Sequence, residues 1–383
     1  MIYFDNAATT FPKPPSVLSE VEHCIRFWCG NPGRGSHALS RAAAERIYEC
    51  REEAASFFGL DNPENVVFTL NTTMALNMAI KGLLRRGDHV LISDMEHNSV
   101  LRPVAALAER GEITYDVFPT SCGGNTTPSS EEILRAIAQR IRPQTSAVIC
   151  THASNICSAI LPIAEIGALC HAKGLSFIVD GAQSAGILPL DMKRMNIDIL
   201  CLPGHKGLYG LQGSGLLLLA PGIRLATLTE GGNGVNSLDT SMPEGSPERY
   251  ESGTLSTPAI VGLCEGIRFI KRVGRETIEE HERGLGRRLT EMLANTRGIK
   301  VFAPQFVGST VLFAVDGMAS DAVGRALDAR GFCVRCGFHC SALGHRTLGT
   351  PESGAVRVSF GFFNSADQVE AFRRAVVEIK RNP

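Results

Sequence analysis

The sequence predicts an α/β fold with a mostly parallel sheet, followed by a smaller α+β unit. Short apolar or β-branched runs alternate with helix-patterned segments between about residues 65 and 220. A chain of 383 residues is also longer than a single hydrophobic core usually serves. We therefore expect a large unit of residues 15–262 and a small unit of residues 1–14 and 263–383.

Seven runs predict the strands of the large sheet. In chain order they are NVVFTL, HVLISD, ITYDVF, AVICTHA, LSFIVD, DILCLP and GLLLLA. Only residues 204–213 separate the last two runs, which is too short for a crossover helix, so this pair should be antiparallel. The segments TTMALNMAIKGLLRR and SSEEILRAIAQRIR have apolar residues three and four apart, which predicts helices that cover the sheet.

The pattern changes after the seventh run. Residues 221–258 are rich in Gly, Ser and Pro, which predicts a long loop of the kind that is usually functional or at an interface. A helix-patterned segment then extends to about residue 296, followed by strand-like VGSTVLFAV, helix-like SDAVGRALDARG and strand-like AVRVSFGF. Ser365 and Gln368 have capping-box spacing and predict the start of a closing helix.

Composition limits the class of function. The formal net charge is −1, which gives no reason to expect nucleic acid or an anionic membrane as a partner. The segment MIYFDNAATT lacks the basic and long apolar parts of a signal peptide, so we expect a cytoplasmic protein. We expect most of the twelve cysteines to be buried as small apolar residues, with Cys333, Cys336 and Cys340 as exceptions in a loop.

A lysine and an aspartate suggest the chemistry. Lys206 lies in GHKG after an apolar run, and Asp180 directly follows the run in LSFIVDGAQ, where a strand end opens into a crevice. A buried carboxylate needs a cationic partner, and a protonated pyridine nitrogen would provide one. A lysine that bonds the cofactor and an acid that faces its ring nitrogen are the minimal equipment for pyridoxal phosphate.

These segments, in order with NTT, EHN and HASN, resemble the fold-type I pyridoxal-phosphate enzymes of the class V aminotransferase group. Within that group the chain is similar to SufS-like cysteine desulfurases, from DNAATT at residues 5–10 to VRVSFGFFN at residues 356–364. The resemblance implies a large domain with a mainly parallel seven-stranded sheet and a small α+β domain.

The resemblance also implies roles for particular residues. Lys206 would bond the cofactor and transfer protons, Asp180 would pair with the ring nitrogen, and His97 would stack on the ring. The other residues that the resemblance places at the cofactor are Thr72, Thr73, Asn155, Gln183, His205 and Thr254. Of these, Thr72, Thr73 and His205 would hold the phosphate, and Thr254 would reach the phosphate of a neighbouring subunit, which implies a homodimer.

Alternatives remain at several positions. Thr72 could cap its helix, and His97 or His205 could serve only to hold a loop or turn. Pro203 stands where many relatives have a phosphate-binding serine, and Asn71 stands where many have glycine. The phosphate contacts would then be distributed differently.

The segment VRCGFHCSALGHRTLGT resembles the loop that carries the sulfur-accepting cysteine of the family. It implies that the Cys340 thiolate, favoured by Arg335 and His339, attacks the sulfur of L-cysteine and leaves alanine and a persulfide. Arg357 would bind the substrate carboxylate, with Arg335 and Asn155 nearby; a structural salt bridge is the alternative for Arg357.

Cys336 could resolve the persulfide, form a disulfide or do nothing. Zinc binding by Cys333, Cys336 and Cys340 is disfavoured, because no matching ligand set follows at metal spacing.

Other functions fit parts of the pattern. A selenocysteine lyase or another C–S lyase of the group would use the same cofactor residues without needing Cys340. A sulfur-relay scaffold would keep the fold and pass sulfur to a partner without turnover. The combination of Lys206, Asp180, Gln183 and His97 favours an active desulfurase, which would deliver sulfur to a protein acceptor that the sequence does not identify, with iron–sulfur cluster assembly as one pathway.

Overall fold

The protein is described here from a computed structural model that covers residues 1–33, 35–124 and 126–381. Within these residues, the large sheet has the strand order β2-β8-β7-β6-β5-β3-β4. The strands are β2 (Val66–Thr69), β3 (His89–Ser93), β4 (Thr114–Phe118), β5 (Thr145–Thr151), β6 (Ser176–Asp180), β7 (Ile199–Pro203) and β8 (Gly215–Leu219). Strand β8 is antiparallel to β2 and β7, whereas the other neighbours are parallel. The mostly parallel sheet and its antiparallel last pair are therefore confirmed.

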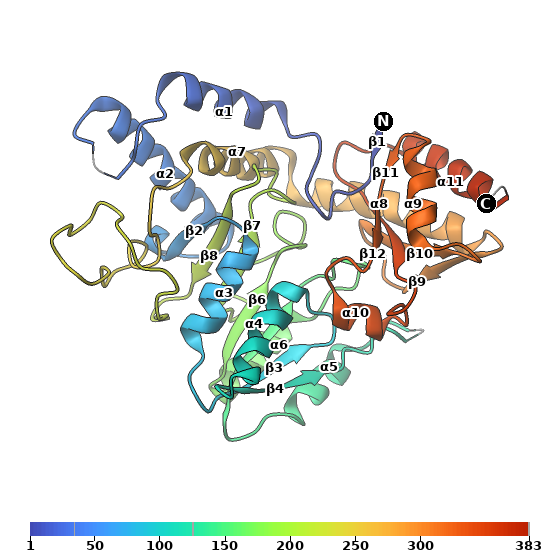
Figure 1. Cartoon of the computed structure of the whole chain (residues 1–383), viewed down its shortest axis with the longest axis horizontal. Helices are drawn as coiled ribbons and strands as arrows, with labels where there is room; N and C mark the ends of the chain where they lie inside the picture. Colours follow the sequence, from blue (N-terminus) through green and yellow to red (C-terminus); the bar gives the residue numbers. More distant parts are fainter. Residues whose placement is uncertain (34, 125, 382–383) are drawn as a thin grey trace.

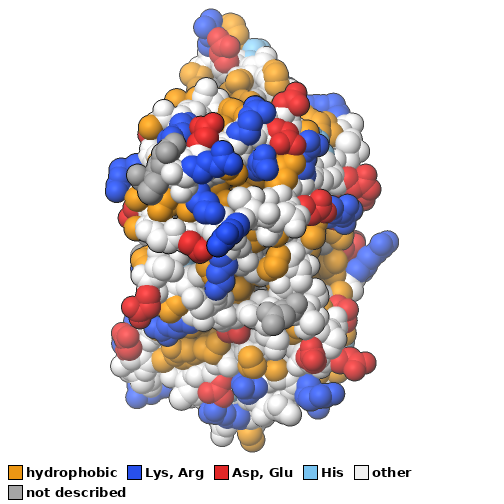
Figure 2. Space-filling model, turned by 90° about the vertical axis from the view of Figure 1, so that its right-hand side faces the viewer, with side chains coloured by type: hydrophobic (Ala, Val, Ile, Leu, Met, Phe, Trp, Pro, Cys, Tyr) orange, Lys and Arg blue, Asp and Glu red, His pale blue; other side chains and the backbone are white. Residues whose placement is uncertain are grey.

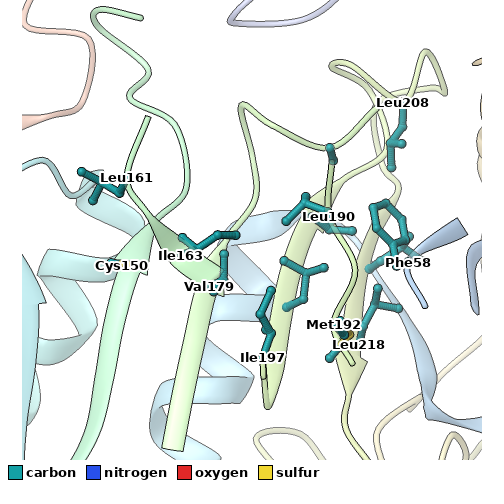
Figure 3. Close-up of a cluster of buried hydrophobic side chains, with 14 of the residues drawn as sticks. Phe58, Cys150, Leu161, Ile163, Val179, Leu190, Met192, Ile197, Leu208 and Leu218 are labelled. Atoms are coloured by element: carbon teal, nitrogen blue, oxygen red, sulfur yellow. The ribbon is translucent and has the colours of Figure 1, made fainter. Parts of the chain in front are cut away.

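Helices cover both faces of this sheet (Figure 1). One face packs on α3 (Thr72–Leu83) and α4 (Asn98–Glu109). The other face packs on α2 (Ala38–Phe57), α5 (Ser130–Ala138), α6 (Ile163–Lys173) and α7 (Thr257–Val273). Successive strand residues point to opposite faces, so Val90 and Ile92 join the first core and Leu91 joins the second. Figure 3 shows part of the second core, with Met192 beside Leu218 of β8.

The rest of the chain forms the smaller α+β unit. Its strands are β9 (Ile299–Phe302), β10 (Thr310–Val315), β12 (Arg335–Gly337) and β13 (Ala355–Ser359), paired antiparallel in the order β12-β13-β10-β9. Strand β1 (Ile2–Tyr3) pairs in parallel with β11 (Phe332–Cys333). The helices are α8 (Arg275–Ala294), α9 (Ser320–Asp328), α10 (Ala342–Thr347) and α11 (Ala366–Arg381). Both termini lie on this side of the molecule (Figure 1), so the chain leaves the small unit and returns to it.

The helix-patterned segment expected up to about residue 296 is helical, and two helices occupy it. Helix α7 ends and α8 begins at Gly274, whose φ of 93° is readily adopted only by glycine. Helix α7 packs on α1 (Pro15–Phe27) and α2, and it runs through the expected boundary at residue 262. The division of the chain into two domains stays a prediction.

Two local expectations agree with the structure. Residues 220–256, all described, form a loop between β8 and α7 without helix or strand. At the start of α11, the Ser365 amide donates to Gln368 Oε1 at 3.2 Å, and the Gln368 amide donates to Ser365 Oγ at 3.4 Å. The cysteines that are buried are Cys24, Cys50, Cys122, Cys150, Cys157, Cys170, Cys201 and Cys264. Cys29 differs from the expectation, because it is exposed.

Figure 2 shows the face on the small-unit side, where Lys and Arg side chains gather in the upper half and acidic side chains lie mainly around them. The near balance of charge over the chain therefore does not describe every face. Among the helices of the described residues, none is both long and apolar enough to cross a membrane.

Candidate active site

A cavity lies at the carboxyl ends of the parallel strands. Strand β6 ends at Asp180 and β7 ends at Pro203, and helices α3 and α4 begin beside them. Such strand ends form the usual ligand crevice of an open α/β sheet. The sequence-predicted residues that line the cavity are Thr72, Thr73, His97, Asn155, Asp180, Gln183, His205 and Lys206.

Lys206 and Asp180 are oppositely charged residues that line this cavity. Asp180 is 2% exposed, accepts a hydrogen bond from the Ala182 amide at 2.9 Å, and has a pKa that burial raises. Burial lowers the pKa of Lys206 to about 8, and the Asp180 carboxylate opposes that effect. An amine with this pKa exchanges its proton readily near neutral pH, so Lys206 can both accept and donate a proton.

The backbone next to Lys206 is held by the amino-terminal segment. The carbonyl oxygen of His205 accepts hydrogen bonds from Thr9 Oγ1 at 3.0 Å, the Thr10 amide at 3.1 Å and Lys13 Nζ at 2.8 Å. Burial lowers the pKa of Lys13 to about 8. Thr10 Oγ1 also donates to the Lys206 carbonyl, across 196 residues of sequence. These contacts fix the position of the Lys206 main chain.

The amino terminus of α3 fits a phosphate. Asn71 caps the helix, because its side chain accepts from the Met74 amide at 2.9 Å. The alternative that Thr72 caps the helix is therefore wrong. Among the described residues, the buried Thr72 Oγ1 and His205 Nδ1 atoms have no hydrogen-bond partner. Two unsatisfied polar atoms beside a helix amino terminus suit the phosphate of the cofactor.

His97 is the cap of α4 and is tied to α3. Its Nδ1 atom accepts from the Ser99 amide at 3.1 Å, which places the ring proton on Nε2. Ser99 Oγ also lies 2.9 Å from His97 Nδ1 and 2.8 Å from Thr73 Oγ1. Burial lowers the pKa of His97 to about 4, and the Lys206 ammonium adds to the effect. His97 is therefore a neutral, oriented ring in the cavity wall.

Gln183, Asn155 and Arg357 connect the cavity to the small unit. Gln183 Nε2 donates to the Ala7 carbonyl at 3.0 Å. Arg357, on β13, donates from one terminal nitrogen to the Asn155 carbonyl at 2.8 Å and pairs through the other with Asp5 Oδ1 at 2.7 Å. The structural salt bridge considered as an alternative for Arg357 is therefore present. The buried Nε atom of Arg357 has no partner in the described part of the chain.

The loop of Cys340 docks against the cavity. The Cys340 carbonyl accepts from the Asn98 amide, directly after His97, at 2.8 Å, and the His339 carbonyl accepts from Asn155 Nδ2 at 2.7 Å. Cys340 is exposed, whereas Cys336 is half-buried with a pKa that burial raises to about 11. Exposure beside the cavity favours Cys340 over Cys336 as the reactive thiol. In residues 1–33, 35–124 and 126–381, no three His, Cys, Asp or Glu side chains gather as metal ligands would.

Four predicted site residues lie outside the cavity lining: Cys340 and Arg357, described above, and Arg335 and Thr254. Arg335 is exposed on β12 and pairs in register with Arg357. Thr254 is exposed and lines a different cavity, next to a buried ion pair between Arg51 and Glu251. Glu251 Oε1 also accepts from the Phe68 amide at 2.7 Å, which fixes the loop that carries Thr254.

Three neighbours of the site were missed in the sequence analysis. Asp5 pairs with Arg357 across 352 residues. Ser99 links His97 to Thr73, and its place two residues after a histidine at a helix start was the available signal. Glu96 is fully buried, accepts from the Thr151 amide at 2.9 Å, and has a pKa that burial raises to about 8.

Glu282 provides a test of electrostatics next to the site. It is buried on α8, in a small cavity shared with Lys206 and Gln183, and burial raises its pKa from the ordinary 4.5 to about 8. A carboxyl group whose pKa is higher in the folded than in the unfolded protein contributes its full stabilisation to the fold only below the unfolded pKa. This contribution is lost progressively as the pH rises towards the folded pKa of about 8. Each pH unit in that window corresponds to roughly 1.4 kcal/mol.

Between pH ~6 and ~8, we expect the free energy of unfolding to fall less in the Glu282→Gln variant than in the wild type. The difference between the two decreases should be about 1 to 3 kcal/mol. Urea unfolding at several pH values measures this difference. Glu280→Gln, at an exposed position of the same helix, is the control and should follow the wild type. Parallel pH profiles for Glu282→Gln and the wild type would contradict the assignment of a neutral Glu282.

The fold, together with a lysine and a buried aspartate that line one cavity beside a helix amino terminus, defines an enzyme class, the fold-type I pyridoxal-phosphate enzymes. The aminotransferase class-V family model matches residues 2–372. The chain belongs to this family and, within it, to the cysteine desulfurases. Enzymes of this family generally depend on pyridoxal phosphate.

The relatives differ in length. A probable cysteine desulfurase of Methanothermobacter thermautotrophicus is 31% identical over 99% of this chain and 94% of its own length. One from Mycolicibacterium paratuberculosis is 32% identical, but this chain spans only 55% of that relative. This chain is also similar to the apo structure of the cysteine desulfurase from Thermococcus onnurineus NA1, with 30% sequence identity and a TM-score of 0.89. The match covers 100% of this chain and 95% of the other chain.

Proposed function

We propose that this protein is a pyridoxal-phosphate-dependent cysteine desulfurase that converts L-cysteine to L-alanine and transfers the sulfur to Cys340. The observation that carries the proposal is the hydrogen bond between the Asn98 amide and the Cys340 carbonyl. It brings an exposed thiol to the helix start that holds His97 in the cavity. The names of the relatives support the same activity.

The residues of the cavity suit the cofactor in distinct ways. Thr72, Thr73 and His205 would hold the phosphate, Asp180 would pair with the ring nitrogen, and Lys206 would bond the aldehyde carbon. His97 would stack on the ring, with Gln183 and Asn155 at its polar edge. When bound, pyridoxal phosphate supplies an electron sink that stabilises negative charge on the substrate α-carbon.

Lys206 and Cys340 would then carry out different steps of the reaction. Lys206 Nζ, with its pKa lowered to about 8, takes the proton from the substrate α-carbon. The Cys340 thiolate attacks the substrate sulfur, so that an S–S bond forms and the Cβ–S bond breaks, with its electron pair left on the substrate carbon. Protonation of that carbon gives the methyl group of alanine. The balance is cysteine plus the Cys340 thiol to alanine plus the Cys340 persulfide.

Arg357 would bind the substrate carboxylate. Its Nε–H is buried without a partner among the described residues, and its terminal nitrogens already hold Asp5 and the Asn155 carbonyl. A carboxylate that accepts from Nε would give each of the three guanidinium nitrogens a hydrogen-bond partner. Arg335 lies opposite Arg357 on the neighbouring strand and would add positive charge at this end of the cavity.

The test is incubation of the purified holoenzyme with L-cysteine. We expect alanine in step with sulfide when a reductant is present, and one added sulfur on the Cys340 peptide by mass spectrometry when it is absent. Pyruvate and ammonia in place of alanine would indicate another C–S lyase. A marked preference for selenocysteine would indicate a selenocysteine lyase, and absence of turnover with any of these substrates would indicate a relay scaffold.

A homodimer is part of the proposal. Tyr48 of α2 is 48% exposed and lines the Thr254 cavity, and α1 exposes the apolar side chains of Ile25 at 61% and Phe27 at 64%. Burial of this surface in a second copy would bring Thr254 to the partner's phosphate. We expect light scattering to give twice the mass of one chain, and a fully active monomer would exclude this role of Thr254. The acceptor protein, a role in iron–sulfur cluster assembly and the cytoplasmic location remain predictions.

A further inference from the structure

The turn that presents Cys340 has an unusual backbone. His339 and Cys340 are consecutive residues with φ of 50° and 54°, in the left-handed region that non-glycine residues seldom adopt. Each therefore costs free energy and must be held by its surroundings. Hydrogen bonds to the two carbonyl groups, from Asn155 Nδ2 at 2.7 Å and the Asn98 amide at 2.8 Å, hold one side of the turn.

A pair of buried histidines holds the other side. His339 Nδ1 lies 3.1 Å from Nε2 of His345 on α10, and the two rings are stacked at 5.3 Å. His345 Nδ1 lies 2.6 Å from Thr350 Oγ1, and His339 Nε2 lies 3.2 Å from the Arg335 carbonyl. His339, His345 and Thr350 are 5%, 1% and 1% exposed, respectively. We call these three side chains the histidine chain.

The partners fix the direction of every hydrogen bond in the histidine chain. A carbonyl only accepts, so His339 must carry its proton on Nε2 and accept at Nδ1. His345 must then donate from Nε2, which leaves its Nδ1 to accept from the Thr350 hydroxyl. A proton added to His339 would go to Nδ1 and place two hydrogens between the rings. Burial lowers the pKa of His339 to about 3, with Arg357 adding to the effect, and burial also lowers the pKa of His345, so both rings stay neutral.

We propose that His345 and Thr350 are positioning residues of the sulfur-transfer reaction, which act through His339 to hold the left-handed turn that sets Cys340 against the start of α4. The Thr350 hydroxyl donates to His345 Nδ1 and so holds the ring whose Nε2 donates to His339, and that donation anchors the ring of the first residue of the turn. This role rests on the proposed function, because it assumes that the Cys340 thiol must be held close to the substrate sulfur. The proposal gives a role to His345, which lies in the segment VRCGFHCSALGHRTLGT and had no role in the sequence analysis.

Thr350→Val and Thr350→Ser form a matched pair for the test. Valine has the shape of threonine but no hydroxyl, so His345 Nδ1 loses its donor and the ring that donates to His339 is held less firmly. Serine keeps the hydroxyl. In the holoenzyme, we expect alanine turnover at saturating cysteine to fall about tenfold in Thr350→Val, with the KM for cysteine and the cofactor absorption band little changed. Thr350→Ser should keep most of the activity.

Two further measurements do not depend on turnover. In ¹⁵N-histidine NMR spectra of the wild type, His339 and His345 should both be neutral Nε2–H tautomers near neutral pH. Hydrogen exchange of the Asn98 amide, which bonds the Cys340 carbonyl, should accelerate about tenfold in Thr350→Val and not in Thr350→Ser.

The outcomes separate the two proposals. An Nδ1–H tautomer of either histidine, or unchanged Asn98 exchange and turnover in Thr350→Val, would overturn the positioning role. A lower melting temperature of Thr350→Val with wild-type turnover would also overturn it, because that result indicates stabilisation alone. If the wild type makes no alanine, the proposed function fails, and the tautomers and the Asn98 exchange still decide whether the histidine chain holds the turn.

Discussion

Replacing Cys340 by alanine is expected to reduce alanine formation by about 10³-fold or more, because the variant has no nucleophile for the substrate sulfur. Binding of the cofactor should be unaffected, since the Cys340 side chain is exposed and is not part of the cavity lining. Substrate cysteine should still change the cofactor absorption spectrum, because that change precedes sulfur transfer. Single-turnover assays of alanine, together with absorption spectra, measure the two steps separately.

Cys336→Ala is the matched control for Cys340→Ala. Cys336 lies four residues earlier, is half-buried, and has a pKa that burial raises to about 11, so little of it is thiolate near neutral pH. We expect its loss to cost less than about threefold in turnover. Intact alanine production in Cys340→Ala, or added sulfur found only on Cys336, would contradict the proposed sulfur transfer and leave the cofactor site standing.

Replacing Asp180 by alanine should have the second largest effect, a loss of about 10²-fold or more in turnover. Asp180 ends β6 with its carboxylate buried at 2% exposure, and we propose that it keeps the ring nitrogen of the cofactor protonated. Without that charge the ring is a weaker electron sink. The absorption spectrum of bound cofactor should shift together with the loss of activity, and titration with pyridoxal phosphate should show weaker binding.

Asp316→Ala tests whether the effect is specific to Asp180. Asp316 also follows an apolar strand, β10, but it is exposed and belongs to the small unit. We expect wild-type turnover and spectra for Asp316→Ala. Near-normal turnover in Asp180→Ala would show that another acid serves the ring, and the buried Glu96 would be the next residue to replace.

The large sheet was predictable because each buried strand is a short apolar run between helical segments. The short connection between DILCLP and GLLLLA was enough to predict the antiparallel pairing of β7 and β8. Gly274 was the missed feature, since apolar periodicity continues across it while its positive φ separates α7 from α8. A periodic pattern indicates which residues face a core, but it does not show where a helix axis changes direction.

The site was predictable from local motifs only as far as those motifs extend. GHKG and DGAQ identified Lys206 and Asp180, and both residues line one cavity. The pairing of Arg357 with Asp5, and the docking of Cys340 on the start of α4, join segments that share no sequence pattern. Such contacts depend on how the two units pack, which no single motif encodes.

The hydrogen bonds from the amino-terminal segment to the His205 carbonyl affect the order in which parts of the molecule can fold. Residues 2–9 have their partners far along the chain, since Thr9 bonds the His205 carbonyl, the Ile2 amide bonds the Gly331 carbonyl and the Phe4 carbonyl accepts from the Ser359 amide. Contacts of such long sequence separation form late in folding. A nascent chain that has already formed the large sheet therefore lacks these contacts around the lysine until β13, the last strand of the described residues, has been synthesised. A product truncated before β13 would not carry a complete site.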